Sequence, residues 1–337
     1  MNISIMPDEM HAALLQLFKS LQFSDESADL LAKTHTQSTM CGVNSHGINR
    51  VPIFTEFVKS GVVKPDVKAK KVEAFGQIER WDGQFGSGVV NASLCTERAI
   101  ELAKNNGMGL VALKNTNHWM RAGSYGVQAA KAGCIGIMFT NTQANMPPWG
   151  ASENRLGNNP LVVSIPNKDS HIVLDMAMSQ FSFGKIHEYH LKNEPLPIPG
   201  GWDEDHQMST DPQTILASEK SIPTGYWKGS ALSMVLDMLA TLLSAGSSTK
   251  NISQSPVETG VSQVFLCIDT KAMNRPELHT QLLDEIIDYT QSAATQTADT
   301  RVKYPGQRAQ ESYQLSKVNG MQVSQEIWDQ VVELIKT

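Results

Sequence analysis

Four separate parts of the chain carry side chains that could together act on a small acid. They are His46 with Arg50, Asn117 with His118, Asp175, and Lys228. An imidazole exchanges a proton near neutral pH, a guanidinium binds a carboxylate at two points, and a lysine binds ribose or phosphate oxygens. The set fits the reduction of an oxo acid by a dinucleotide. It equally fits a protein that binds small acids without chemistry.

The motifs of several other enzyme classes are missing. The sequence has no G-x-G-x-x-G after a predicted strand, no P-loop, no G-x-S-x-G and no H-E-x-x-H. His187 and His190 are three residues apart, and we interpret them as part of an exposed helix face rather than a zinc site. The four cysteines form no C-x-x-C pair: Cys41, Cys95, Cys134 and Cys267. We therefore predict no metal site, and reduced thiols.

The composition is that of an ordinary globular protein, with 41% hydrophobic and 18% charged residues. A length of 337 residues suggests about two domains. The net charge of −6 and the lack of a basic cluster argue against nucleic acid or an anionic membrane as a partner. No apolar run approaches the ~20 residues that span a bilayer, and the first residues do not resemble a signal peptide. We therefore expect a cytoplasmic protein.

His46 and Arg50 both lie in the segment 44–61, whose apolar residues recur at helical spacing. Two amphipathic helices are expected before it, over 7–21 and 24–40. A spacing of four residues would put the imidazole and the guanidinium on one face of the third helix, one turn apart.

The stretch NTNHWMRAGSYG contains Asn117, His118 and Arg121. The apolar run before it, 108–114, predicts a buried strand, and 124–132 predicts a helix. A corner between a strand and a helix exposes side chains at the edge of a sheet, where α/β proteins tend to place their sites. The corner is therefore a candidate site.

The remaining elements are expected to build a mixed α/β fold. Strands are predicted at 67–75, 78–82, 134–140, 161–165, 171–176 and 261–268, and helices at 88–105, 179–191, 229–245, 276–295 and 324–336. Residues 141–160 and 195–212 are predicted loops. The strands pair as hairpins about as often as they alternate with helices, so a purely parallel sheet is not expected. Helix 229–245 is apolar on most faces and is expected to be buried.

Six motifs, in order along nearly the whole chain, resemble one family. They are SHGINR at 45–50, NTNHWMRAGSYG at 115–126, MPPWGA at 146–151, LGNNP at 156–160, IVLDMAMS at 172–179 and GYWKGSALSMVLDMLATLLS at 225–244. Together they are similar to the type-2 malate/L-lactate dehydrogenase family, which reduces 2-oxo acids with NAD(P)H and is unrelated to the Rossmann dehydrogenases. The resemblance explains the missing glycine motif.

The resemblance implies roles for individual residues. His46 would donate the proton, while Arg50, His118 and Asn117 would bind the substrate; some relatives give the acid–base role to the position of His118. The cofactor would be held by His171, Ile172, Val173, Leu174, Asp175, Met176 and Ala177, by Trp227 and Lys228, and by Gly306, Gln307 and Arg308. Asp175 could instead orient His46. The pair Gln307-Arg308 departs from the closest family pattern.

The resemblance also implies an architecture and an assembly. Residues 1–66 and 276–337 would form a helical domain, and residues 67–275 a non-Rossmann NAD-binding domain with a mixed, largely antiparallel sheet. We expect a homodimer, because the apolar helix 229–245 needs a further surface to cover it. The expected reaction is the reduction of a sugar-derived 2-oxo acid by NADH, with NADPH possible. Malate, L-lactate or ureidoglycolate remain alternatives, as does a non-catalytic binder of small acids or nucleotides.

Overall fold

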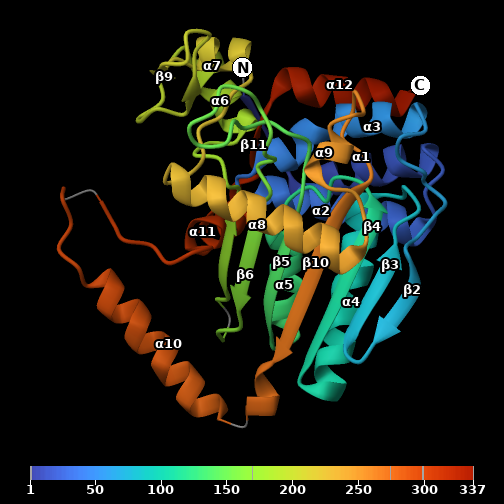
Figure 1. Ribbon diagram of the computed structural model, residues 1–337. Coiled ribbons are helices and arrows are strands. Elements are labelled where there is room, and N and C mark those ends of the chain that lie inside the picture. The colour runs from blue at the N-terminus through green and yellow to red at the C-terminus, as the bar shows by residue number, and fades with distance from the viewer. Residues whose placement is uncertain (1, 169, 274, 298–299, 337) are drawn as a thin grey trace.

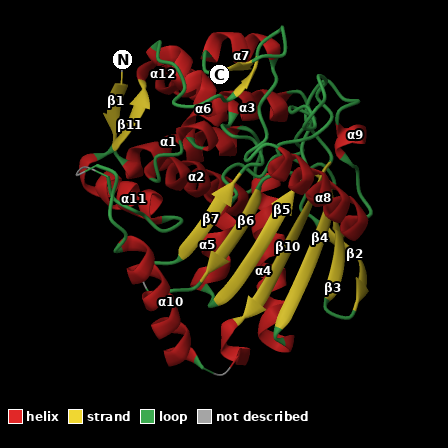
Figure 2. Cartoon of the chain, turned by 60° about the vertical axis from the view of Figure 1, so that its left-hand side comes forward, coloured by secondary structure: helices red, strands yellow, loops and turns green. Residues whose placement is uncertain are grey.

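A seven-stranded sheet forms the centre of the computed structural model, which describes residues 2–168, 170–273, 275–297 and 300–336. Figure 2 shows its strands in the order β2 (Lys70–Phe75), β3 (Ile78–Asp82), β4 (Met108–Thr116), β10 (Val261–Asp269), β5 (Cys134–Thr140), β6 (Leu161–Ile165) and β7 (Ile172–Met176). All neighbouring strands are antiparallel except β3 and β4, which run parallel. The predicted mixed, largely antiparallel α/β fold is confirmed.

Helices cover both faces of this sheet (Figures 1 and 2). Helices α4 (Gly88–Asn106) and α5 (Gly123–Lys131) pack on one face, and α8 (Trp227–Ser244) packs on the other. Val111 belongs to the core beneath α4, whereas Ala112, the next residue of β4, belongs to the core beneath α8. Because side chains alternate between the two faces of a strand, β4 contributes to two separate cores.

A further core is built by both ends of the chain. Its elements are β1 (Asn2–Ile5), α1 (Pro7–Ser20), α2 (Asp25–Met40), α3 (Val51–Lys59), β11 (Met321–Ser324) and α12 (Gln325–Lys336). Strand β1 pairs with β11, and Figure 1 shows both termini in the upper part of the molecule among these helices. Phe18, Leu31 and Val331 are fully buried in this one cluster. As predicted, a serine, Ser24, caps α2, and its hydroxyl accepts the N–H of Ser27.

The residues between β7 and α8 form a small lobe. It contains α6 (Phe183–Lys192), β8 (Gly201–Trp202), β9 (Met208–Ser209) and α7 (Pro212–Ser218). The lobe buries Ile186, Leu196 and Ile215 in a core of its own. At its neck, the N–H of Gln180 donates to the carbonyl of Ile222 at 2.7 Å. The remaining helices are α9 (Thr249–Ile252), α10 (Pro276–Gln291), which projects away from the body in Figures 1 and 2, and α11 (Gln307–Asn319).

The segment 44–61 is not one helix, so His46 and Arg50 do not share a helical face as predicted. Two 3-10 turns, Asn44–His46 and Ile48–Arg50, come before α3. They are separated by Gly47, where a Cβ would lie 2.3 Å from Oγ1 of Thr39 in α2. The same hydroxyl accepts the N–H of the residue after Gly47 at 3.0 Å. The chain folds tightly against α2 here, and regular helical spacing is lost.

Helix α8 is not buried on most faces, contrary to the prediction. Trp227 is 62% exposed, Met238 53% and Leu242 71%. The reason is geometric, because one side of α8 lies on the sheet while no other layer of the described residues covers its opposite side. The helix therefore presents an apolar strip at the surface.

Several elements, most of them short, were not predicted. They are strands β1 and β11, helices α7, α9 and α11, and the pair β8–β9. The predicted helix 179–191 begins later, at Phe183, because the hydroxyl of Ser182 caps it by accepting the N–H of Lys185. Elements of two to seven residues contain too few apolar positions to display a period, which explains most of these omissions.

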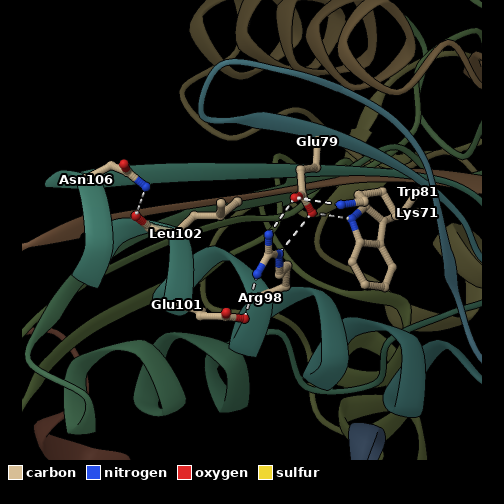
Figure 3. Close-up of polar contacts among 7 residues, drawn as sticks. All are labelled: Lys71, Glu79, Trp81, Arg98, Glu101, Leu102 and Asn106. Carbon is tan, nitrogen blue, oxygen red and sulfur yellow. Dashed lines mark hydrogen bonds and ion pairs between the residues drawn. The ribbon is translucent and has the colours of Figure 1, made fainter.

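Figure 3 shows the polar cluster that fastens α4 to the sheet. Glu79 on β3 is only 3% exposed, and its carboxylate accepts two hydrogen bonds from Arg98 of α4 at 2.7 and 3.1 Å. Nε1 of Trp81 donates to the same carboxylate at 2.9 Å, and Nζ of Lys71 lies 3.5 Å away. Arg98 also pairs with Glu101 at 2.7 Å. The bonds from Arg98 are the main cause that lowers the pKa of Glu79.

We predict that Glu79→Ala lowers the free energy of unfolding by about 1.5–3 kcal/mol, because it removes a buried carboxylate that accepts charge-assisted hydrogen bonds from the half-buried Arg98. The exposed partner of Arg98 provides the control, and Glu101→Ala should cost less than about 1 kcal/mol. Urea denaturation at neutral pH measures both. Because the folded-state pKa of Glu79 is lowered, its contribution should disappear as the pH falls through that value. Equal losses in the two variants would contradict the assignment.

Candidate active site

His46 lies where the helical body, the lobe and the sheet approach one another. Oγ of Ser45 is 3.0 Å from Nδ1 of His46. The first turn of α6 packs on the same serine, since a Cβ at Gly184 would lie 2.8 Å from Cβ of Ser45. The lobe therefore rests directly on the turn that carries His46, and this approach requires a residue without a side chain.

His118 faces His46 from the corner between β4 and α5. The two imidazole rings are stacked, with centroids 5.6 Å apart and planes inclined by 24°. The N–H of Met120 donates to Nδ1 of His118 at 3.0 Å, so a neutral His118 carries its proton on Nε2. Met120 has a φ of +62°, an uncommon conformation for a residue with a side chain, and it aims this N–H at the ring. The structure thus unites the two predicted histidines.

Both imidazoles are neutral at neutral pH in the free protein. Burial, followed by the charges of Arg50 and Arg121, lowers the pKa of His46 to about 4. Burial also holds the pKa of His118 well below its ordinary value, with Arg50 and His46 as further causes. A bound anion would offset the field of the guanidinium groups and raise both pKa values. The proton-donating ability of the pair therefore depends on the charge of what binds there.

Arg50 shares its surroundings with Glu258. Burial lowers the pKa of Arg50, and the charge of Glu258 opposes that effect. Burial raises the pKa of Glu258, while the N–H of Gln143, 3.0 Å from Oε2, and the charge of Arg50 lower it. The hydroxyl of Thr259 donates to Oδ1 of Asn117 at 2.9 Å. The segment that carries Glu258 is thereby tied to the corner of the second histidine.

Arg121 acts electrostatically on both His46 and Asp175. Nη1 of Arg121 donates to Sγ of Cys41 at 3.3 Å. The N–H of Gly123 donates to Oδ2 of Asp175 at 2.7 Å, and a Cβ at Gly123 would lie 2.8 Å from that oxygen. Asp175 is accessible to solvent, yet the protein around it raises its pKa, with Arg121 and the Gly123 N–H acting in the opposite direction. A side chain that is open to solvent yet surrounded by protein on its other sides is typical of a concave site.

Asn117 is buried, and its amide is engaged within the protein. Nδ2 donates to the carbonyls of Phe85 and Gly86 at 3.0 and 2.9 Å, and Oδ1 accepts from Thr259. These bonds join the loop after β3 to the corner that carries His118. They support a positioning role for Asn117, and its predicted contact with substrate stays a prediction.

Strand β7 brings two predicted cofactor segments together. The N–H of Val173 donates to the carbonyl of Pro305 at 2.9 Å. Gly306 has a φ of +93°, and a Cβ there would lie 3.1 Å from the nitrogen of Val173. Residues 306–308, at and just before the start of α11, therefore lie along the outer edge of β7, which forms most of the segment 171–177.

The third predicted segment meets the chain just after β7. A Cβ at Gly229, in the first turn of α8, would lie 3.0 Å from the carbonyl oxygen of Met178. Trp227 and Lys228 precede that glycine and are both exposed, as is Arg308. An indole and two cations, groups that can contact the rings and phosphates of a dinucleotide, are thus exposed on segments whose backbone approaches β7 or the residues just after it. The three segments fit a nicotinamide cofactor.

A separate cavity of about 800 Å³ lies between the loop after β5 and the lobe. Its walls include Trp149, Arg155, Trp202 and Lys220. The ring of Trp149 lies 5.0 Å from that of Tyr226, just before α8. The two histidines and two arginines of the cluster are not among its lining residues. The cavity therefore does not define the candidate active site.

The sequence prediction of the cluster is incomplete in two respects. It places Arg121 in the corner without a role, although a guanidinium three residues after His118 is a visible signal. It misses Glu258 altogether. No motif marks Glu258, because only the folding of its loop onto Gln143 and Asn117 brings it to Arg50.

Known proteins are similar to this chain in both sequence and fold. The model of the malate/L-lactate dehydrogenase family matches residues 5–332. The 2,3-diketo-L-gulonate reductase of Salmonella typhi is 40% identical over 328 residues, which cover 97% of this chain and 98% of the relative. The crystal structure of malate dehydrogenase from Entamoeba histolytica superposes with a TM-score of 0.94 at 22% identity, covering 100% of this chain and 98% of that one. Sulfolactate dehydrogenase from Methanocaldococcus jannaschii has a TM-score of 0.88 at 26% identity, covering 99% and 97%.

These likenesses place the protein among the oxidoreductases, as a dehydrogenase that uses a nicotinamide cofactor. Within that class, the chain belongs to the malate/L-lactate dehydrogenase family. The resemblance drawn from the six motifs is confirmed. The missing glycine motif has a structural reason, because the largely antiparallel sheet is not the parallel sheet on which a Rossmann fold builds that motif.

We predict that the imidazole of His46 titrates near pH 4 in the free protein. Arg50→Gln should raise this pKa, because removing a neighbouring positive charge makes the imidazolium less unfavourable. An NMR titration of the imidazole resonances, assigned with His46→Ala, measures the change. The substitution Arg301→Gln, at an exposed site, is the control and should leave the midpoint unchanged. A midpoint of His46 close to that of a solvated histidine would contradict the prediction.

Proposed function

We propose that the protein reduces the C2 carbonyl of a sugar-derived 2-oxo acid with NADH. Our choice of substrate is 2,3-diketo-L-gulonate, with 3-dehydro-L-gulonate as the product. The observation that carries the proposal is the stacked pair of His46 and His118 in the field of Arg50 and Arg121. The Salmonella relative, a 2,3-diketo-L-gulonate reductase 40% identical over nearly the whole chain, supports the choice of substrate.

In the proposed mechanism, Arg50 binds the carboxylate of the acid and turns its C2 carbonyl toward the histidines. The negative charge offsets the guanidinium field, so His46 takes up a proton as the acid binds. When bound, the nicotinamide supplies the hydride that forms the new C–H bond. His46 then gives its proton to the forming alkoxide, and the Nε2 proton of His118 would stabilise the same oxygen. The product is a 2-hydroxy acid.

The residues proposed to hold the cofactor are 171–177, Trp227 with Lys228, and 306–308. The contacts of Gly306 with Val173 and of Gly229 with Met178 support a single site. NADH is the proposed reductant, and NADPH is the alternative. The KM values for the two reductants, measured with the same acid, decide between them.

The second candidate substrate is a smaller acid than the sugar-derived one, and the likeness to sulfolactate dehydrogenase favours it. Malate, L-lactate or ureidoglycolate dehydrogenation would use the same histidines and arginines. A panel of oxo acids, followed by the absorbance of NADH, separates these reactions. Faster consumption with oxaloacetate or pyruvate than with 2,3-diketo-L-gulonate would overturn our choice. Binding of NADH without turnover of any acid would instead support a non-catalytic binder.

We predict that His46→Ala lowers kcat by about 10²–10⁴-fold, the usual contribution of general acid catalysis. NADH binding should be nearly intact, since the proposed cofactor residues lie in or beside β7, in α8 and at the start of α11. Stopped-flow turnover and fluorescence titration of NADH measure the two quantities.

The control for this prediction is His187→Ala, which removes an exposed histidine of the lobe and should leave kcat unchanged. His118→Ala tests the alternative donor. Normal turnover by His46→Ala, with a collapse in His118→Ala, would transfer the proton-donor role to His118.

Two further parts of the proposal concern architecture and location. We propose a helical domain of residues 1–66 with 276–337 and a cofactor domain of residues 67–275. The separate cores of the helical body and the sheet support this division, although α10 projects away from both.

No helix in the part of the chain that the structure describes is long and apolar enough to cross a membrane. We propose a cytoplasmic location, which the four free cysteine thiols support.

We also propose that the protein works as a homodimer joined through α8. The exposed apolar side chains of this helix are Trp227, Leu232, Met234, Val235, Met238, Leu239 and Leu242. A strip of this kind is costly to leave in water, and a two-fold pair is the common way to cover it. The strip begins beside Lys228, so the proposed dimer would enclose part of the cofactor site.

We predict that Met238→Lys produces single chains that bind NADH at least tenfold more weakly, because a desolvated charge blocks the proposed interface. Leu191→Lys is the matched control: Leu191 is 74% exposed on α6 of the lobe, and its replacement should change neither property. Light scattering and NADH titration on the same samples measure both. A fully active single-chain particle of the unsubstituted protein on dilution would defeat the dimer proposal.

A further inference from the structure

His35 is a fully buried histidine of α2 that lies behind the turn carrying His46. Its ring packs against the rings of Phe18 and Phe54, with centroids 5.6 and 6.0 Å away. Its Nδ1 is 3.0 Å from the carbonyl oxygen of Gly47. A carbonyl oxygen can only accept, so Nδ1 carries the proton of the neutral ring and donates it to Gly47.

The peptide unit between Gly47 and Ile48 is held by α2 at both ends. Its carbonyl accepts the hydrogen bond from His35, and its N–H donates to Oγ1 of Thr39 at 3.0 Å. His35 and Thr39 are four residues apart and therefore lie on the same side of α2. Together they fix the orientation of this one peptide plane, which neither bond does alone.

This peptide unit stands between the two residues that we place at the substrate. His46 ends the 3-10 turn before Gly47, and Arg50 ends the turn after it. The N–H of Arg50 donates to the same carbonyl oxygen at 3.1 Å, so that oxygen accepts from both His35 and Arg50. The positions of the imidazole and the guanidinium thus depend on one carbonyl.

The packing of the helical core does not by itself require a histidine at position 35. Burial lowers the pKa of His35 to about 4, so the ring is neutral at neutral pH and its Nε2 carries no proton. Nε2 is buried, and no donor within the described part of the chain bonds to it. An unpaired acceptor in a core is destabilising, and a phenylalanine would fill a similar space without one. What the imidazole adds is the donor toward Gly47.

We propose that His35 is a positioning residue, which holds His46 in its stack with His118 and keeps Arg50 in place through the carbonyl of Gly47. The inference rests on the proposed function, which gives His46 and Arg50 their roles in the reduction. His35 acts through the backbone of the turn. Loss of its donor leaves the peptide unit free to rotate, and both side chains then lose their alignment.

Two substitutions separate the hydrogen bond of His35 from the packing of its ring. His35→Asn places its amide Nδ2 close to the position of the imidazole Nδ1, so it keeps a donor toward Gly47 and loses most of the ring. His35→Phe keeps the ring and loses the donor. A purely structural role requires activity to follow stability. A positioning role requires the opposite order, with the asparagine variant lower in thermal midpoint and higher in activity.

The kinetic test uses the acid that the unsubstituted protein reduces fastest. We expect His35→Phe to lower kcat by about 10²-fold, the loss that a displacement of about 1 Å can cause, and to raise KM for the acid through Arg50. His35→Asn should restore most of both values. Partial unfolding cannot produce this result, because it removes active sites without changing KM. A loss of kcat in His35→Asn equal to that in His35→Phe would overturn the proposal.

The matched control is His11→Phe, the same substitution elsewhere in the helical core. It removes a hydrogen bond to α2, since Nε2 of His11 lies 3.1 Å from Oδ1 of Asp29, but leaves the turn untouched. Its kcat and KM should equal those of the unsubstituted protein. If His35→Phe does not fold, His35→Leu takes its place, because it lacks the donor as well.

The contact between the two imidazoles provides a readout without turnover. In protein with isotope-labelled histidine, the nuclear Overhauser effect between the ring protons of His46 and His118 should be lost in His35→Phe and kept in His35→Asn. If this pattern appears but no acid is reduced, the proposed function fails and the positioning role stands. If acids are reduced and the folded donor-free variant keeps the effect, the proposed function stands and the inference fails.

Discussion

The candidate active site depends on the enclosure of two arginines beside two histidines. Enclosure alone disfavours every charged form in the cluster, and it lowers the pKa of His46 and His118 while it raises that of Glu258. The guanidinium groups then add to the effect on the imidazoles. The free protein therefore holds both imidazoles in the neutral form at neutral pH. An anion bound beside the arginines opposes this effect, so in the proposed mechanism substrate binding and activation of the proton donor are one electrostatic event.

This arrangement needs a rigid frame, because four groups from distant parts of the chain must keep their positions. The frame is made largely of close approaches by glycine. Gly47 allows the His46 turn to approach α2 closely, and Gly184 allows the lobe to approach Ser45. Gly123 allows the carboxylate of Asp175 to approach the start of α5. Each approach is closer than a side chain would allow. The amide of Asn117 completes the frame from the sheet side by joining three segments through backbone carbonyls.

The long elements could be predicted from periodicity, and the detailed geometry of the site could not. Strands such as β5 and β10 and helices such as α2 and α4 contain enough apolar residues to display their period, and all four are confirmed. The pairing of His46 with Arg50 rested on a regular helix, and the structure replaces this helix with two 3-10 turns because of one contact with Thr39. The convergence of His46 on His118 followed from family resemblance rather than from spacing. Glu258 could not be found, because its position near Arg50 is a tertiary property.

Helix α8 links the chemistry of the site to the surface of the molecule. Its first turn carries Trp227 and Lys228 and packs beside Met178, whereas its outer side carries the exposed apolar strip. A helix of this length moves as one body, so a partner that settles on the strip also fixes the first turn against the end of β7. The same strand holds Asp175 against Gly123, beside the corner of His118. In the proposed dimer, cover for the apolar strip and order in the proposed cofactor site would therefore be coupled through one rigid element.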